Sequence, residues 1–136
     1  MSEAEIVYQI SEIYNRVWSI QQWWASMSIG LLILAHLASE RLNLLLVMFI
    51  MALYSSFSLY VFNILGRNWN TIVSYIQDLQ ELKDTDHDLS SGTLTFLIPQ
   101  SEIVTSLVII VLVSTFIGCN AYLVYSYLKI RRKKNA

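Results

Sequence analysis

Proline and glycine are scarce in this chain, which has one proline and four glycines among its 136 residues. Both residue types interrupt helices and form turns, so their scarcity predicts long helices with few connections. Charged residues are also scarce, at 14% of the chain against about a quarter in soluble domains. A single cysteine excludes an intramolecular disulfide and cannot hold a metal alone.

Motifs of catalysis are missing as well. The sequence has no glycine-rich phosphate loop, no H-E-x-x-H and no nucleophile elbow. His36 and His87 are expected at opposite ends of the molecule, and Cys119 lies in an apolar run where a thiolate is disfavoured. The alternating acids of 84–88 suggest a calcium loop, but Leu89 stands where such a loop needs glycine. We therefore expect no enzyme activity, no cofactor and no metal.

Three apolar runs have the length of a bilayer crossing, at 17–38, 44–65 and 103–128. At about 1.5 Å per residue, each spans roughly 30 Å as a helix. The second and third runs contain no charged residue and therefore lack the polar face that helices of a small soluble bundle need. The sequence predicts an all-α integral membrane protein with three transmembrane helices, folded as one membrane domain over 1–136.

The first run begins with an unusually polar stretch, SIQQWWASMSIG (19–30). It is not expected to be a secretory signal peptide, because the preceding residues carry three acids and one base whereas a signal peptide begins with basic residues. Tryptophan favours the boundary between lipid and water. A belt of tryptophans at that boundary therefore accounts for much of the polarity, and its members are Trp18, Trp23 and Trp24.

The distribution of charge predicts the orientation in the membrane. The basic tail 129–136 holds five bases and the 39–43 turn adds Arg41, whereas nine of the ten acids lie on the other side. Because Lys and Arg accumulate on the cytoplasmic side, we expect a bacterial inner-membrane protein with the N-terminus and 66–102 outside and the C-terminus inside. The tail is interpreted as a topology signal and a contact for anionic membrane lipids, in preference to a nucleic-acid site.

Two amphipathic extensions, 2–16 and 67–84, emerge on the same side of the membrane. They are followed by an acidic, irregular link at 85–101, in which Pro99 ends the link and Ser101 caps the third helix. Neither extension can bury its apolar stripe alone. We expect them to pack on each other or on neighbouring subunits as a helical collar that holds subunits together or binds a regulatory ligand or protein; the alternative is that each lies flat on the membrane. The stripe residues are Ile6, Ile10, Ile13, Trp69, Ile72, Val73, Ile76 and Leu79.

Polar side chains inside a membrane are costly and are often functional. On the first helix, one strip has polar ends and an apolar middle, and it comprises Gln22, Ser26, Ile29, Ile33 and His36. In a ring of copies this strip is predicted to line an ion pathway, with its isoleucines as a constriction that gates by dewetting. A competing interpretation is that such residues only join helices by hydrogen bonds. Helix packing is the favoured role for the pairs Ser26/Gly30 and Ser114/Gly118, and both roles stay open for Gln22, Asn63 and His36. The candidates for helix packing are Gly30, Ser56, Asn63, Ser114 and Gly118.

Three helices have too little interior to enclose all these polar groups, so a homo-oligomer is expected. In architecture the chain resembles phage holins, which are small three-helix pore formers with an outside N-terminus and a basic inside tail. It also resembles compact membrane effectors of antiphage defence, and it departs from the holin plan at 67–84 and in its long link. The resemblance implies an ion channel or pore-forming effector gated through the collar. The alternative is a non-conducting accessory subunit of a larger membrane complex.

Overall fold

The computed structural model describes residues 1–85, 88–98 and 102–134. Within these ranges the chain forms helices and no strand, which confirms the all-helical prediction. The expectations for His87, Pro99 and Ser101 lie outside the described residues. In chain order the elements are α1 (Glu3–Leu37), the short 3₁₀ helix η1 (Ser39–Arg41), α2 (Leu44–Asp84), α3 (Ser91–Leu94), the 3₁₀ helix η2 (Thr95–Leu97) and α4 (Glu102–Lys134).

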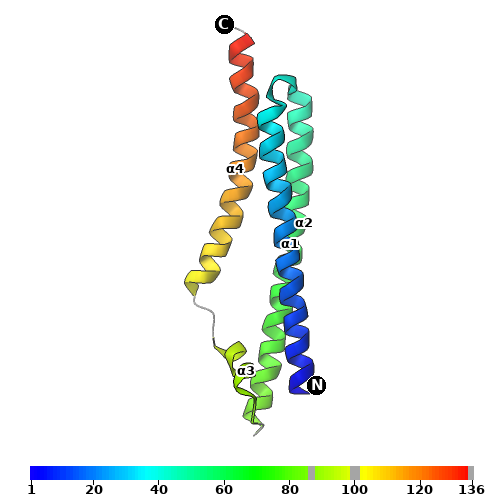
Figure 1. Ribbon diagram of the computed structural model, residues 1–136, viewed down its shortest axis with the longest axis vertical. Helices are drawn as coiled ribbons and strands as arrows, with labels where there is room; N and C mark the ends of the chain where they lie inside the picture. Colours follow the sequence, from blue (N-terminus) through cyan, green and yellow to red (C-terminus); the bar gives the residue numbers. More distant parts are fainter. Residues whose placement is uncertain (86–87, 99–101, 135–136) are drawn as a thin grey trace.

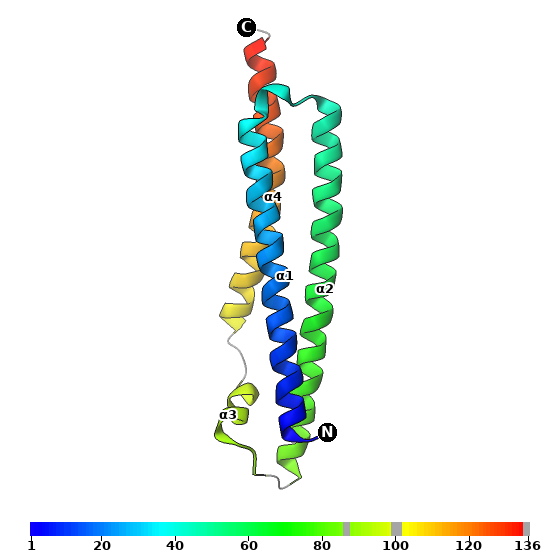
Figure 2. The same ribbon diagram turned by 45° about the vertical axis from the view of Figure 1, so that its right-hand side comes forward.

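The helices α1 and α2 form a long antiparallel hairpin, and α4 packs beside its upper half (Figure 1). α3 and η2 lie against the lower part of the hairpin, near the N-terminus, while the C-terminus lies at the opposite end (Figures 1 and 2). The first turns of α4 lie farther from α1 than its later turns do. The acidic N-terminal end and the basic C-terminal end are therefore separated by the full length of the molecule.

Local sequence explains where the two long helices begin. Ser2 Oγ accepts a hydrogen bond from the Glu5 amide at 3.4 Å, and Glu5 Oε2 accepts one from the Ser2 amide at 2.8 Å, which is a capping box. Asn43 Oδ1 accepts from the Leu46 amide at 2.8 Å and starts α2 in the same way. No proline interrupts either helix, so α1 runs for 35 residues and α2 for 41. Each amphipathic extension therefore forms one continuous helix with the apolar run beside it in the chain.

Among the described residues, two helices are long and apolar enough to cross a membrane, namely α2 and the Thr105–Lys133 part of α4. α1 is not among them, since the glutamines and serines of 19–30 lower the hydropathy of its apolar run. The prediction of three spans is therefore supported at α2 and α4 and is not confirmed at α1.

The two extensions pack on each other at the lower end of the hairpin. Ile6 and Ile10 of α1 meet Leu79 of α2, and all three are almost completely buried. Ile13 and Ile72 are buried as well, whereas Trp69 and Val73 are 37% and 39% exposed at the edge of the stripe. The half-buried side chains around this cluster are Val7, Tyr14, Tyr75, Ile76, Leu82, Phe96 and Leu97. We call this packed end of the molecule the collar.

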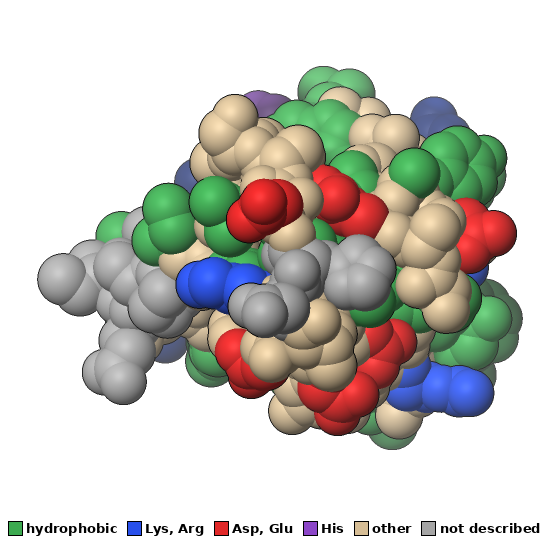
Figure 3. Space-filling model, turned by 90° about the horizontal axis from the view of Figure 1, so that it is seen from below, with side chains coloured by type: hydrophobic (Ala, Val, Ile, Leu, Met, Phe, Trp, Pro, Cys, Tyr) green, Lys and Arg blue, Asp and Glu red, His purple; other side chains and the backbone are tan. Residues whose placement is uncertain are grey.

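The link after α2, expected to be irregular, contains the short helical turns α3 and η2. It is fastened to α1 by Glu3, whose Oε1 accepts hydrogen bonds from the Ser90 amide at 3.1 Å, from Ser90 Oγ at 2.8 Å and from Thr93 Oγ1. This Glu3 junction holds Phe96 and Leu97 over the collar cluster. The same end of the molecule carries a group of acidic side chains (Figure 3).

Leu79 offers a test of collar packing, since it is fully buried while Val73 on the same helix is 39% exposed. Leu79→Ala is expected to lower the free energy of unfolding by about 2–5 kcal/mol, because it leaves a cavity between the extensions. Val73→Ala should change it by less than about 1 kcal/mol. Thermal unfolding in detergent, followed by circular dichroism, measures both variants. Equal destabilisation by the two would contradict the packing described.

The Glu3 junction is expected to open in acid. Hydrogen bonds from Thr93 and then Ser90 hold the pKa of the Glu3 carboxyl below its ordinary value of 4.5. The ionised form is favoured in the folded state, so its stabilisation is complete above pH 4.5 and is lost as the pH falls through the lowered pKa. Protection of the 90–94 amides from hydrogen exchange, corrected for intrinsic rates, should fall over that range. Glu3→Gln should remove this pH dependence and Glu12→Gln should keep it; retention of the dependence in Glu3→Gln would assign it to another group.

Candidate functional site

Two buried hydrogen bonds join α1 and α2 in the middle of the hairpin. Trp24 Nε1 donates to Ser58 Oγ at 3.0 Å, and Ser28 Oγ lies 2.8 Å from Tyr54 Oη. All four side chains are at most 6% exposed. In an apolar environment a hydrogen-bonded polar pair specifies which helix faces meet, because a shifted arrangement would leave the groups unpaired.

The burial of Trp24 corrects its assignment to the interfacial tryptophan belt. Neighbouring residues on a helix point about 100° apart, so only one of Trp23 and Trp24 can face α2. Trp24 takes that place at 3% exposure, whereas Trp18 and Trp23 are 63% and 74% exposed, as the belt requires. Of the three tryptophans, Trp24 alone belongs to the interior.

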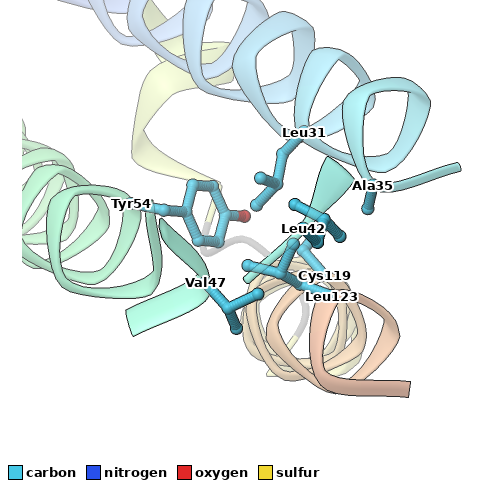
Figure 4. Packing of buried hydrophobic residues seen from close by; sticks show 7 residues of the cluster. All are labelled: Leu31, Ala35, Leu42, Val47, Tyr54, Cys119 and Leu123. Carbon is cyan, nitrogen blue, oxygen red and sulfur yellow. The ribbon is translucent and has the colours of Figure 1, made fainter. Parts of the chain in front are cut away.

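α4 completes the interior through small and aromatic side chains. Cys119 Sγ donates to the carbonyl of Ser28 at 3.7 Å, and Phe116 stacks on Tyr54 with ring centres 5.9 Å apart. At the upper end, apolar side chains from all three long helices and from the 38–43 connection converge (Figure 4). This cluster consists of Leu31, Ala35, Leu42, Val47, Tyr54, Cys119 and Leu123.

The predicted pore strip lies on the opposite face of α1. Its residues sit about 150° around the helix from the buried line that runs through Trp24, Ser28 and Ala35. All five are exposed: Gln22, Ser26, Ile29, Ile33 and His36. Of these, His36 reaches another helix, since its Nδ1 lies 3.0 Å from Tyr122 Oη on α4. We call this surface the outer strip of α1.

The small residues predicted to pack helices also face outwards within one chain. A Cβ atom added at Gly30 or Gly118 would meet no atom within 4 Å, and Ser56, Asn63 and Ser114 are exposed. Packing inside the chain instead uses a second set of small residues, which the sequence reasoning missed. That set consists of Ser28, Ala35, Ser58, Cys119 and Ser126. The spacing from Trp24 through Ser28 to Ala35 contained this signal, but it resembles the strip on the opposite face that starts at Gln22.

Two grooves open on the surface of the bundle. The larger, of about 660 Å³, is apolar and lies between α1, α2 and α4 where α4 leans away, with Trp18, Gln21 and Trp69 among its lining residues. The smaller, of about 490 Å³, lies at the opposite end, and its lining is about equally polar and apolar. We call the smaller one the basic-end groove. Its lining residues are His36, Ser39, Glu40, Tyr122, Tyr125, Ser126, Lys129, Ile130 and Lys133.

Comparison of the chain with protein-family models, curated proteins and solved structures finds no match. Within residues 1–85, 88–98 and 102–134, no group of three or more His, Cys, Asp or Glu side chains is arranged to hold a metal ion. Function is therefore inferred from the side chains that the fold leaves facing outwards.

The Trp24–Ser58 hydrogen bond can be tested with a double-mutant cycle of Trp24→Phe and Ser58→Ala. Hydrogen bonds between helices in a membrane contribute about 0.6 kcal/mol on average and up to about 1.7 kcal/mol. We expect a coupling free energy in that range, measured by unfolding in mixed micelles. The matched control is Ser56→Ala, which removes an exposed hydroxyl from the same helix and should show no coupling to Trp24→Phe. No coupling in the Ser58 cycle would mean that the bond does not fix the hairpin.

Proposed function

We propose that the chain is a homo-oligomeric membrane channel or pore-forming effector that passes ions along the outer strip of α1. In this proposal α1 crosses the membrane beside α2 and α4. The observation that carries it is the outward position of Gln22, Ser26, Ile29 and Ile33 on α1, with His36 exposed at the end of the same strip, where it also contacts Tyr122 of α4. In a single copy Gln22 and Ser26 have no enclosed environment, whereas His36 is paired with Tyr122.

Lipid is a poor environment for such a strip, because polar and ionisable groups in a membrane favour protein partners or water. A ring of copies satisfies them by turning each outer strip towards a shared axis. Ile29 and Ile33 then lie between the polar ends of the strip and form a hydrophobic constriction, which excludes ions when it dewets. The same arrangement gives Gln22 and His36 contact with water at the two mouths.

The other outward-facing small residues fit contacts between neighbouring copies. Ser56 and Asn63 lie on the outer side of α2, opposite its buried Tyr54 and Ser58. The open surroundings of Gly30 and Gly118 allow the backbone of another helix to approach closely. In this proposal, these four residues pack against neighbouring copies, because they are not used in packing within one chain.

The collar is suited to gating because it is continuous with the proposed pore lining. α1 runs without interruption from Ile6 and Ile10 to His36, so a rotation or shift imposed at the collar is transmitted along one helix. A ligand or protein that binds the exposed edge of the stripe at Trp69 and Val73 would act at that point. By charge the collar faces outwards and the basic tail faces the cytoplasm of a bacterium.

Conductance of the purified protein in planar bilayers tests the proposal. Ile33→Asn is expected to raise the open fraction of stepwise currents severalfold, because a polar side chain keeps the constriction hydrated. Leu34→Asn, the matched control, adds the same group to the neighbouring flank of α1 and should leave gating unchanged. Gln22→Ala and His36→Ala should alter unitary conductance while leaving the size of the assembly intact.

A second result would overturn the channel. If wild-type and Ile33→Asn proteins are inserted and oligomeric yet conduct nothing, the outer strip is a contact surface. A non-conducting accessory subunit then becomes the better account, and copurification of a membrane partner that is lost in Gln22→Ala would support it.

A further inference from the structure

The basic-end groove has the composition of a site for an anionic headgroup. It lies where α1 ends and α4 continues past the 38–43 connection (Figure 1). Lys129 and Lys133 stand one helical turn apart on α4 and line the same groove. Glu40 lines it as well, so two lysines face one carboxylate and the lining is net positive.

Hydrogen-bond donors surround these charges. Ser126 is only 5% exposed, lines the groove, and has no hydrogen-bond partner within the described part of the chain. Tyr122 is held by His36 at 3.0 Å, and the Lys129 ammonium lies 5.9 Å from the centre of the Tyr125 ring. A phosphate group accepts from hydroxyl and ammonium donors of this kind.

Exposed leucines stand next to two groove residues in the chain. Leu37 follows His36 in the chain and is 77% exposed, and Leu128 precedes Lys129 and is 46% exposed. A ligand that matches the whole surface therefore has an anionic head and apolar chains. We propose that the basic-end groove binds the phosphate headgroup of an anionic phospholipid in the leaflet at the basic end. Anionic lipids are enriched in the cytoplasmic leaflet, the side predicted for the basic tail.

The site depends on membrane insertion and not on ion conduction, so binding can succeed or fail whatever the currents show. The measurement is titration of the full-length, detergent-solubilised protein with short-chain phosphatidylglycerol, followed by native mass spectrometry. Phosphatidylcholine and inorganic phosphate serve as the neutral-lipid and free-anion probes.

Two double variants that each remove two positive charges distinguish binding at the groove from nonspecific electrostatic attraction to the basic tail. Lys129→Gln with Lys133→Gln removes both lysines of the groove, whereas Arg131→Gln with Arg132→Gln removes two exposed bases of the same tail that do not line it. The first pair should weaken phosphatidylglycerol binding by at least about tenfold, since it removes the charge-assisted hydrogen bonds that the groove lysines donate to the phosphate. The second pair should weaken it by less than about threefold.

Each of three results would overturn the proposal. Equal losses in the two double variants would show diffuse attraction to the tail. Equal affinity for phosphatidylcholine would show that the net negative charge of the headgroup is not recognised. Binding of inorganic phosphate as tight as that of phosphatidylglycerol would make the groove a site for a free anion.

Discussion

The antiparallel contact between α1 and α2 is the constraint on which the rest of the molecule depends. Apolar side chains gain little from meeting each other in lipid, so hydrogen bonds and close packing must specify how membrane helices meet. Hydrogen bonding and close packing both occur along one face of α1, where Trp24 bonds Ser58 and Ser28 bonds Tyr54. Once this line faces inwards, Gln22 and the outer strip of α1 face outwards.

The same contact aligns the collar. Because α1 and α2 are unbroken, the rotation that brings Trp24 towards α2 also brings Ile6 and Ile10 towards Leu79, at the far end of the two helices. The apolar runs and the collar thus lie on the same two continuous helices, and the Glu3 junction fastens the link to their lower end. The collar and the outer strip therefore belong to the same continuous helix.

The two ends of the bundle differ in charge and in chemistry. The N-terminal end combines acidic side chains with a packed apolar collar, whereas the other end places lysines of α4 beside the hydroxyls of Tyr122 and Ser126. Continuation of α4 past the α1–α2 connection creates the basic-end groove, because its last turns have only the 38–43 connection to pack on. The collar and the basic-end groove therefore both arise because the three long helices differ in length and end at different levels of the bundle.

By itself the sequence determined the helical class, two of the apolar runs, the collar stripes and the separation of charge. These follow from run length and from strong contrast between polar and apolar faces, as at Ile6, Ile10 and Leu79. Only the tertiary structure decided that Trp24, Ser28 and Ser58 point inwards while Trp23, Ser26 and Ser56 point outwards. In the apolar runs, strips on opposite faces of one helix carry similar residues, so periodicity defines the strips without choosing between them. The choice requires a partner helix whose groups pair with one strip and leave the other exposed.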